Sequence, residues 1–292
     1  MAQRLLFIHA LTPLHAGTGQ GVGAIDLPIH RERATNLPLL PGSSIKGCLR
    51  DAMAEHAQRD LLFGSKSQDG EDMNAGALRI SDAQLLLLPV RCLGATFVWA
   101  TCPFVLRRMV RSAMATEQPK MPAIPTPGDG KACLASMDPT VKLNQTQRLV
   151  LEDLDLDPGA GPDMNAVKWC DWLSQGLFPT ANDPWREEMK KRFAVIDDKS
   201  FDFLAEFATE VSAHISIDDR TGTVAEGALW YQEALPAESV LVAILQADKP
   251  RRNGNGLTAE AVLDVVKARD DLQFGGKAST GMGLVRFIPA RA

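Results

Sequence analysis

HAGTGQGVGAIDLPIHRERATNLPLLPGSSIKGCLR, residues 15–50, is the most informative part of the chain. It begins with a loop that has four glycines in residues 15–23, where the main chain can approach a ligand closely. Near its end, Pro41-Gly42 interrupts the preceding structure, and Ser43 or Ser44 can cap the helix that follows. Residues 28–50 hold four Lys or Arg against one Glu, a net charge of +3. We therefore expect a loop beside a basic, phosphate-facing helix start.

The flanking sequence predicts alternating strands and helices. Residues 3–11 are short and apolar, as in a buried strand, and 41–57 form the helix. Residues 77–90 and 93–103 indicate two strands, and 104–114 a helix with its basic residues on one side. The order of strand, helix, strand, strand and helix is typical of the split βαβ of ferredoxin-like domains.

The middle of the chain differs in character. Residues 115–165 contain seven prolines and an acidic run, so we expect an insertion with little regular structure. Short helices are predicted over 169–173 and 183–193, and residues 201–211 have apolar residues at helical spacing.

A hairpin and a closing strand are expected near the C-terminus. Residues 214–236 alternate around a turn at Asp218 to Gly222, as in a β-hairpin. Residues 239–247 indicate a buried strand and 257–268 a helix, and 274–287 combine a glycine-rich loop with a last strand.

Composition excludes several classes of protein. The hydrophobic fraction of 45% and charged fraction of 23% indicate a globular chain. No apolar run approaches the roughly 20 residues of a membrane helix, and the N-terminus lacks the features of a secretory signal. Five scattered cysteines without a C-x-x-C pair argue against a disulfide framework or structural zinc site. We expect a cytoplasmic protein without a membrane partner.

Charge and motifs narrow the chemistry further. A net charge of -5 means that any RNA must bind to a local basic patch or beside partners. Gly19 to Ala24 fits the dinucleotide fingerprint G-x-G-x-x-A, but the proline at 28 argues against the helix that this site requires. The Walker spacing is missing around Lys46, and His30-x-Glu32 has no deaminase P-C-x-x-C partner. His15 and Asp26 lie on either side of the first glycine-rich loop; by residue type alone, either could be structural.

The chain resembles the RAMP superfamily, and within it the repeated backbone subunits of type III-B CRISPR (Cmr) effector complexes. Its most specific match is IDLPIHRE followed by PGSSIKG, within residues 15–50. The Phe63-Gly64 pair, HISIDDRTGTVAEGALWYQE (214–233) and FGGKASTGMGLVRF (274–287) also carry the resemblance, whereas residues 115–200 match weakly.

The resemblance implies an α+β fold: a single RAMP domain over 1–292, with a modified ferredoxin-like or RRM-like palm, helical finger insertions and a projecting β-hairpin thumb. The palm would be formed by residues 1–114 and 237–292. Residues 115–200 would form the fingers and 212–233 the thumb.

The resemblance also assigns roles to residues. Asp26 would be the catalytic aspartate and metal ligand, and His15 the loop histidine, which we expect to contact RNA rather than to act as the essential base. Glu226 and Glu233 are weaker candidates. The residues expected to bind RNA lie in the basic segment, the thumb and the second glycine-rich loop: Arg31, Ser43, Ser44, Lys46, Arg50, Ile215, Ile217, Trp230, Tyr231, Lys277 and Thr280.

The implied function is metal-dependent cleavage of target RNA at regular intervals. Copies of the chain would stack along a guide CRISPR RNA, with other Cmr subunits, and the thumb would flip out a target base. One carboxylate is a sparse site for Mg²⁺ or Mn²⁺, so we expect a weakly bound ion completed by RNA phosphate.

Two alternatives remain at this stage. A non-catalytic scaffold could bind guide RNA and position a partner nuclease, and only Asp26 argues against it. A stand-alone, metal-free RAMP endonuclease would need histidine chemistry. With five histidines and no obvious acid partner, the sequence favours that reading least.

Overall fold

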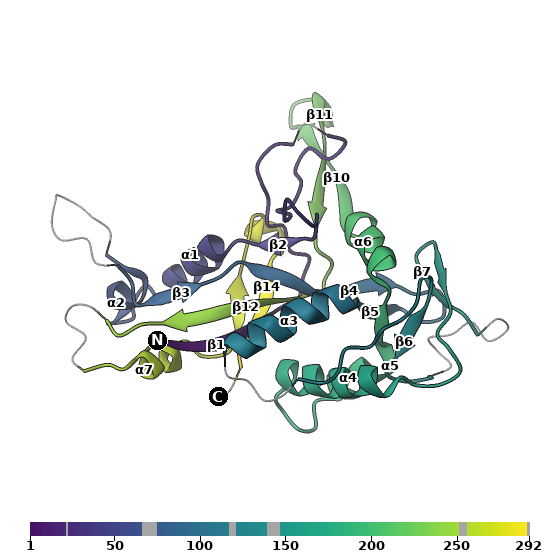
Figure 1. The fold of residues 1–292 in the computed structure, drawn as a ribbon. Helices are drawn as coiled ribbons and strands as arrows, with labels where there is room; N and C mark the ends of the chain where they lie inside the picture. The colour runs from purple at the N-terminus through teal and green to yellow at the C-terminus, as the bar shows by residue number, and fades with distance from the viewer. Residues whose placement is uncertain (22, 66–74, 117–120, 139–146, 251–255, 291–292) are drawn as a thin grey trace.

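The computed structural model describes residues 1–292 except 22, 66–74, 117–120, 139–146, 251–255 and 291–292. Figure 1 shows a large sheet with helices packed around it and one hairpin projecting away. The elements in chain order are β1 (Ala2–Ala10), β2 (Leu39–Leu40), α1 (Gly42–Ala52), α2 (Arg59–Phe63), β3 (Leu78–Ile80), β4 (Ala83–Arg91), β5 (Phe97–Thr101), α3 (Pro103–Ala115), β6 (Ala132–Leu134), β7 (Leu149–Leu151), β8 (Leu154–Leu156), α4 (Met164–Leu177), α5 (Pro184–Arg192), β9 (Phe193–Ile196), α6 (Asp198–Phe207), β10 (Glu210–Asp218), β11 (Thr223–Ala234), β12 (Val240–Ala247), α7 (Ala259–Val265), β13 (Arg269–Gln273), a short 3-10 helix η1 (Ala278–Thr280) and β14 (Leu284–Pro289).

The main sheet has ten strands among the described residues, and its principal path runs β13-β14-β1-β12-β4-β5-β9-β6. Strands β5 and β9 pair in parallel, whereas the other pairs described are antiparallel. Strands β10–β11 and β7–β8 form separate two-stranded sheets. The α+β class predicted from the sequence is confirmed.

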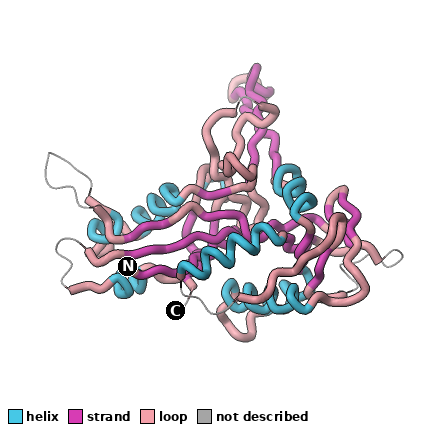
Figure 2. The backbone as a smooth tube through the Cα atoms, in the orientation of Figure 1, coloured by secondary structure: helices cyan, strands magenta, loops and turns pink. Residues whose placement is uncertain are grey.

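The strongest apolar runs occupy the middle of the sheet, as expected for strands covered on both faces. Strand β1 pairs with β12 from Ala2↔Ala247 to His9↔Val240, and with β14 on its other side. Helix α3 runs across the near face of the sheet in Figure 2, and it contacts β1, β4 and β12. Both chain ends therefore contribute to one core.

The predicted strand over 77–90 is in fact two strands. Ser81 and Asp82 separate β3 from β4, and the Asp82 carboxylate accepts a hydrogen bond of 2.8 Å from the Gly42 main-chain N–H. This bond also corrects the predicted capping of the helix. The N-cap position is Pro41, which makes no side-chain cap bond, and the first N–H of the helix is bonded to Asp82 instead. Ser43 and Ser44 lie exposed in the first turn.

Short elements account for most of the other differences from the predictions. Residues 115–165 contain β6, β7 and β8, each of three residues, and β6 joins the main sheet by pairing with β9. The predicted helix over 169–173 extends across Met164–Leu177, because the Asp163 side chain caps it on the Asn165 and Ala166 main-chain N–H groups.

The hairpin was predicted correctly. Strands β10 and β11 pair from Glu210↔Ala234 to Asp218↔Thr223, and the turn lies between Asp218 and Thr223. Figure 1 shows the hairpin standing away from the sheet, beside the purple N-terminal loop. None of the helices in the described part of the chain combines the length and apolar character of a transmembrane segment.

Candidate functional site

Three segments that are distant in sequence meet along the hairpin strand β11. They are the first glycine-rich loop, strand β11 and the glycine-rich loop before β14. A cavity of about 450 Å³ between them is lined by Asp26, Trp230 and Lys277. Gln20, Gly21, Leu27, Gly227 and Leu229 complete its wall. The structure thus brings together the predicted catalytic aspartate and two predicted RNA-binding residues.

The main chain of β11 fixes the position of Asp26. The Leu27 N–H donates to the Tyr231 oxygen over 3.0 Å, and the Glu233 N–H donates to the Leu27 oxygen over 3.0 Å. The Tyr231 N–H donates to Asp26 Oδ2 over 2.7 Å. The Asp26 side chain is exposed, and no hydrogen bond to its Oδ1 atom is found among the described residues. One carboxylate oxygen is therefore held by the hairpin, and Asp26 contributes to the cavity wall.

His15 lies behind this site and does not line the cavity. Its ring is buried, and Nδ1 lies 2.6 Å from the Glu233 main-chain oxygen. Its own main-chain oxygen accepts a bond of 2.9 Å from the Gly276 N–H. His15 therefore joins the hairpin to both glycine-rich loops.

Gly275 shows why that junction needs glycine. Its φ is +77°, and a Cβ atom there would overlap the main-chain oxygen of His15. Two residues later, Lys277 itself adopts a left-handed conformation, with φ of 67°. The Thr280 hydroxyl donates to the Lys277 oxygen over 2.8 Å, so Thr280 shapes the loop that presents Lys277.

The hairpin places its predicted residues on two surfaces. Trp230 lines the cavity and stacks on His214, with ring centroids 5.6 Å apart and planes at 16°. Ile215, Ile217 and Tyr231 are exposed large apolar side chains. His214 was not predicted from the sequence, although its position opposite Trp230 in the hairpin register could have identified it. The Glu226 side chain lies outside the described residues.

The predicted phosphate-facing residues form a second group on α1, away from the cavity lining. Ser43 and Ser44 are exposed, while Lys46 and Arg50 are half-buried one turn apart. Burial lowers the pKa of Lys46, and the positive charge of Arg50 lowers that pKa further. Arg50 lies 3.4 Å from an Asp60 carboxylate oxygen. The Lys46 and Arg50 side chains are thus close enough to bind phosphates of one RNA backbone.

Arg31 has a different setting from the other predicted RNA-binding residues. Its Nη2 atom donates to the Glu233 carboxylate over 2.6 Å, and Nη1 donates to the Ala205 oxygen over 2.9 Å. Glu233 is buried and also accepts hydrogen bonds from Thr209 Oγ1 and the Ile29 N–H. This pair joins the Asp26 loop to α6 and the hairpin, and RNA binding by Arg31 stays a prediction.

A second ion pair, which was not predicted from the sequence, supports the same segment. Arg108 donates two hydrogen bonds to the Glu32 carboxylate, of 2.7 and 2.6 Å. Burial alone would raise the pKa of Glu32, but the hydrogen bonds from Arg108 and Thr35 outweigh it and lower that pKa. The pairing of Arg108 with Glu32 could not be predicted from the sequence, because the two residues lie 76 positions apart.

The chain alone does not build a metal centre at this cavity. Within the described residues, no three His, Cys, Asp or Glu side chains are grouped to hold a metal ion. Asp26 offers one unengaged oxygen, and the Lys277 ammonium lines the same cavity. A hard divalent cation needs about six oxygen ligands, so most would have to come from elsewhere.

Comparison with known proteins identifies the family. The family model for the RAMP superfamily matches residues 7–286. The chain belongs to the RAMP superfamily. The resemblance described from residues 15–50, the hairpin and the C-terminal loop is confirmed at this level.

Individual RAMP relatives match over very different shares of the chain. The CRISPR system Cmr endoribonuclease Cmr4 of Pyrococcus furiosus is 29% identical and covers 98% of this chain and 95% of that protein. The CRISPR system Cms endoribonuclease Csm3 of Enterococcus italicus is 41% identical, but the matched region spans only 26% of this chain and 42% of that protein.

Solved RAMP structures show the same fold. The crystal structure of oligomeric Cmr4 from Pyrococcus furiosus superposes with a TM-score of 0.73 at 22% identity, covering 99% of this chain and 98% of that one. A chain of the type III-B Cmr-beta complex bound to cognate target RNA superposes with a TM-score of 0.69 at 19% identity, covering 99% and 97%.

Proposed function

We propose that this RAMP protein is the repeated backbone subunit of a type III-B CRISPR ribonucleoprotein, and that it cuts RNA complementary to the guide at regular intervals. The observation that carries the proposal is the cavity beside the hairpin strand β11 where Asp26, Trp230 and Lys277 meet. The full-length match to a protein named as a Cmr endoribonuclease supports it. The partners are guide RNA, target RNA, further copies of the chain and other Cmr subunits.

The strand order supports a modified ferredoxin-like palm. Strand β1 lies between β14 and β12, and β12 pairs in turn with β4. Taking β1-α1-β4 and β12-α7-β14 as the two halves gives the split βαβ arrangement. The palm would thus come from both chain ends, residues 115–200 would form the fingers, and the β10–β11 hairpin would be the thumb.

RNA would follow the basic helix start and then meet the thumb. Ser43, Ser44, Lys46 and Arg50 would bind guide phosphates, which carry no sequence information. The exposed side chains of Ile215, Ile217 and Tyr231, together with Trp230, would separate guide from target and turn one base out. Sequence specificity would then rest on base pairing with the guide.

The proposed reaction is attack of a ribose 2′-oxygen on the adjacent phosphorus. Asp26 Oδ1 would accept the 2′-hydroxyl proton as the new P–O bond forms. The bond to the 5′-oxygen would break, and that oxygen would take a proton from water. The Lys277 ammonium would offset the charge that develops on the phosphate. The products would be a 2′,3′-cyclic phosphate and a 5′-hydroxyl end. His15 would position the loops, and its contact with RNA is part of the proposal.

Binding of a divalent ion, Mg²⁺ or Mn²⁺, is a separate proposal. Asp26 would supply one ligand and RNA phosphates the others, so the ion would bind weakly and together with RNA. Removal of divalent ions with a chelator, followed by assay of cutting and of RNA binding separately, tests this point. A cytoplasmic location also stays a prediction.

One observation favours the scaffold alternative. The hydrogen bond from the Tyr231 N–H gives Asp26 a structural role that needs no chemistry. In a scaffold, Asp26 would only hold the loop against the thumb, and a partner would cut the RNA. Histidine-based, metal-free cleavage has less support, because His15 is buried and bonded to Glu233.

The deciding experiment is cleavage of an end-labelled RNA complementary to the guide by the reconstituted complex with Mg²⁺ or Mn²⁺. Wild type should give evenly spaced products, and Asp26→Asn should bind the RNA without cutting it. Asp153→Asn, an exposed aspartate in the β7–β8 turn, is the matched control and should cut normally. If no variant cuts and all bind, the scaffold alternative holds.

A further inference from the structure

A cavity of about 520 Å³ lies between helix α4, the start of α5 and the last strand, β14. It shares no lining residue with the cavity of Asp26. In Figure 1, α4 lies at the bottom of the view and the hairpin stands at the top. The proposed RNA chemistry therefore leaves this cavity unused, although its volume is within the range of roughly 300–1,000 Å³ that small-molecule sites usually have.

Trp172 on α4 forms an aromatic wall of this cavity, which we call the Trp172 cavity. Its ring centroid lies 6.0 Å from that of Phe7 and 6.1 Å from that of Trp169, and both contacts are edge-on. Phe7 and Trp169 are fully buried, so they hold the partly buried indole in place. Within the described part of the chain, no ring stacks in parallel on Trp172. An indole held in this way can stack on a planar ring of a ligand.

Arg186 is the only charged residue that lines the Trp172 cavity, as far as the structure describes the chain. Its Nε atom donates to the Phe178 main-chain oxygen over 2.6 Å, and its side chain is half-buried. Lys190, Lys191 and Arg192 on the same helix each pair with a glutamate, whereas no carboxylate among the described residues pairs with Arg186. Its two terminal nitrogens are thus available to an anion, and their fork fits a phosphate.

Gln175 adds a polar group that can both donate and accept hydrogen bonds. It lies one helical turn after Trp172, on the same face of α4, and both residues line the cavity. Its side chain is exposed, and no hydrogen bond from its amide to another described residue is found. An amide beside an aromatic ring is able to bind the edge of a base that stacks on that ring.

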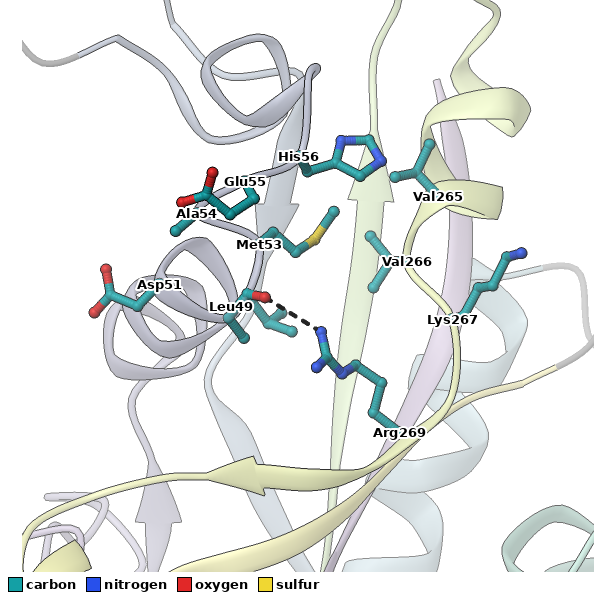
Figure 3. A pocket seen from close by; sticks show the side chains of 11 residues that line it. Leu49, Asp51, Met53, Ala54, Glu55, His56, Val265, Val266, Lys267 and Arg269 are labelled. Atoms are coloured by element: carbon teal, nitrogen blue, oxygen red, sulfur yellow. Dashed lines mark hydrogen bonds between the residues drawn. The ribbon is translucent and has the colours of Figure 1, made fainter.

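A second cavity elsewhere in the molecule shows what distinguishes the Trp172 cavity. It has a volume of about 610 Å³ and lies between the end of α1 and the segment after α7. Figure 3 shows Asp51 and Glu55 on one side of it, and Lys267 and Arg269 on the other. Because these two acidic and two basic side chains balance, that cavity does not select an anion. The lining of the Trp172 cavity has one positive charge and no negative charge among the described residues.

We propose that the Trp172 cavity binds a nucleoside phosphate, with its base stacked on Trp172, the base edge bonded to Gln175 and the phosphate bonded to Arg186. A purely apolar ligand would leave the Arg186 guanidinium without a partner, and a lone inorganic anion would leave the indole unused. A ligand that is both planar and anionic uses both groups. Such a ligand is either a free nucleotide or the 5′-phosphorylated end of an RNA strand.

Isothermal titration calorimetry of the purified chain with 5′-AMP and with adenosine tests the phosphate contact. We expect saturable binding of 5′-AMP, and adenosine should bind about tenfold more weakly, since a hydrogen bond to a charged group has that effect. In Arg186→Gln, 5′-AMP and adenosine should bind with equal affinity. Lys267→Gln changes a charge in the cavity of Figure 3 and is the matched control, which should bind 5′-AMP as wild type does.

Substitutions of Trp172 and Gln175 test the contacts with the base. Trp172→Ala should weaken 5′-AMP binding about tenfold, because that is a typical effect of losing one base–aromatic stack. Trp172→Phe keeps a ring and should bind 5′-AMP more tightly than Trp172→Ala. Since Trp172 also packs on Phe7, circular dichroism is used to check that both variants are folded. Gln175→Ala alters an exposed side chain and should weaken binding about threefold.

A short RNA with a 5′-phosphate and the same RNA with a 5′-hydroxyl distinguish the two sources of the ligand. For an RNA end, the 5′-phosphate should strengthen binding to wild type but not to Arg186→Gln. For a free nucleotide, only 5′-AMP should show this dependence on Arg186. The inference is overturned if the phosphate strengthens the binding of neither ligand, or if its effect persists in Arg186→Gln. The measured quantity is binding, so the result does not depend on whether the chain cuts RNA.

Discussion

The Tyr231 main-chain N–H donates to the Asp26 carboxylate over 2.7 Å, and this bond couples the candidate catalytic loop to the hairpin. Leu27 is bonded on both sides to the same strand, so residues 26 and 27 move with β11. Any displacement of the hairpin on RNA binding would therefore displace Asp26 as well. The position of the Asp26 carboxylate therefore depends on the position of the β10–β11 hairpin.

This bond predicts different behaviour for two substitutions of Asp26. Asn keeps an oxygen that can accept the Tyr231 N–H, whereas Ala removes it at a cost of about 1 kcal/mol. Hydrogen exchange at the Tyr231 amide should thus remain near wild type in Asp26→Asn and become several-fold faster in Asp26→Ala. Equal exchange in both variants would show that the hydrogen bond does not hold the loop.

A second prediction concerns the contact between the two glycine-rich loops. Gly275→Ala places a Cβ atom against the His15 oxygen at a φ of +77°, which costs more than about 1 kcal/mol. The loop carrying Lys277 should move away from Asp26, and RNA cleavage should fall at least tenfold with a lowered melting temperature.

Gly276→Ala is the matched control for that variant. A Cβ atom there would come no closer than 3.4 Å to the His15 ring, and the N–H that binds the His15 oxygen is kept. Its cleavage rate should remain within a few-fold of wild type. If the two variants behave alike, close packing of the loops is not what positions Lys277.

The buried Arg31–Glu233 pair predicts a large stability effect. Glu233→Ala leaves the Arg31 guanidinium without its carboxylate, and breaking a buried pair costs about 3–5 kcal/mol. Chemical denaturation should show this loss. Glu187→Ala breaks the exposed pair with Lys190 and should cost less than about 1 kcal/mol.

A double substitution identifies the origin of that effect. Replacing both partners with apolar residues, as in Arg31→Met with Glu233→Leu, should recover part of the lost stability, because no buried charge remains. RNA cleavage should stay low, since the loop would still lack its anchor. Recovered cleavage in the double variant would exclude a positioning role for the pair.

The sequence predicted the elements with strong local signals. The Asp218–Gly222 turn, the apolar run of β1 and the helix start after Pro41 depend on neighbouring residues, and each lies where the sequence placed it. Strands β6, β7 and β8 have three residues each, too few for a periodic pattern to be visible. Strand β9 was missed because its four residues directly follow α5, and the predicted helix over 183–193 already included Phe193.

The candidate site was predicted in its residues but not in its contacts. Asp26, Trp230 and Lys277 were each proposed from the sequence, and the fold brings them to one cavity. The main-chain bonds that hold Asp26 depend on residues more than 200 positions away, which no local pattern encodes. For the same reason, the burial of Arg31 beside Glu233 could not be foreseen from a run of basic residues.

The last prediction is a pH dependence of RNA binding that originates at Lys46. Its pKa is lowered by burial and by Arg50, so it loses its proton at a lower pH than an ordinary lysine. RNA phosphate binds the protonated form. The contribution of Lys46 is therefore fully present below the lowered pKa and is lost as the pH rises through it, ahead of the usual lysine range near about 10.4.

Replacing Lys46 with arginine distinguishes this effect from a general loss of RNA binding at high pH. Lys46→Arg keeps its charge throughout that range, so its affinity for a guide-length RNA should stay level where wild type weakens. Lys46→Met should bind RNA weakly at every pH. The slope of its log affinity against log salt concentration should be smaller than that of wild type by about one. Fluorescence anisotropy between about pH 7 and 10 measures all three. Parallel curves for wild type and Lys46→Arg would mean that Lys46 does not touch the phosphate track.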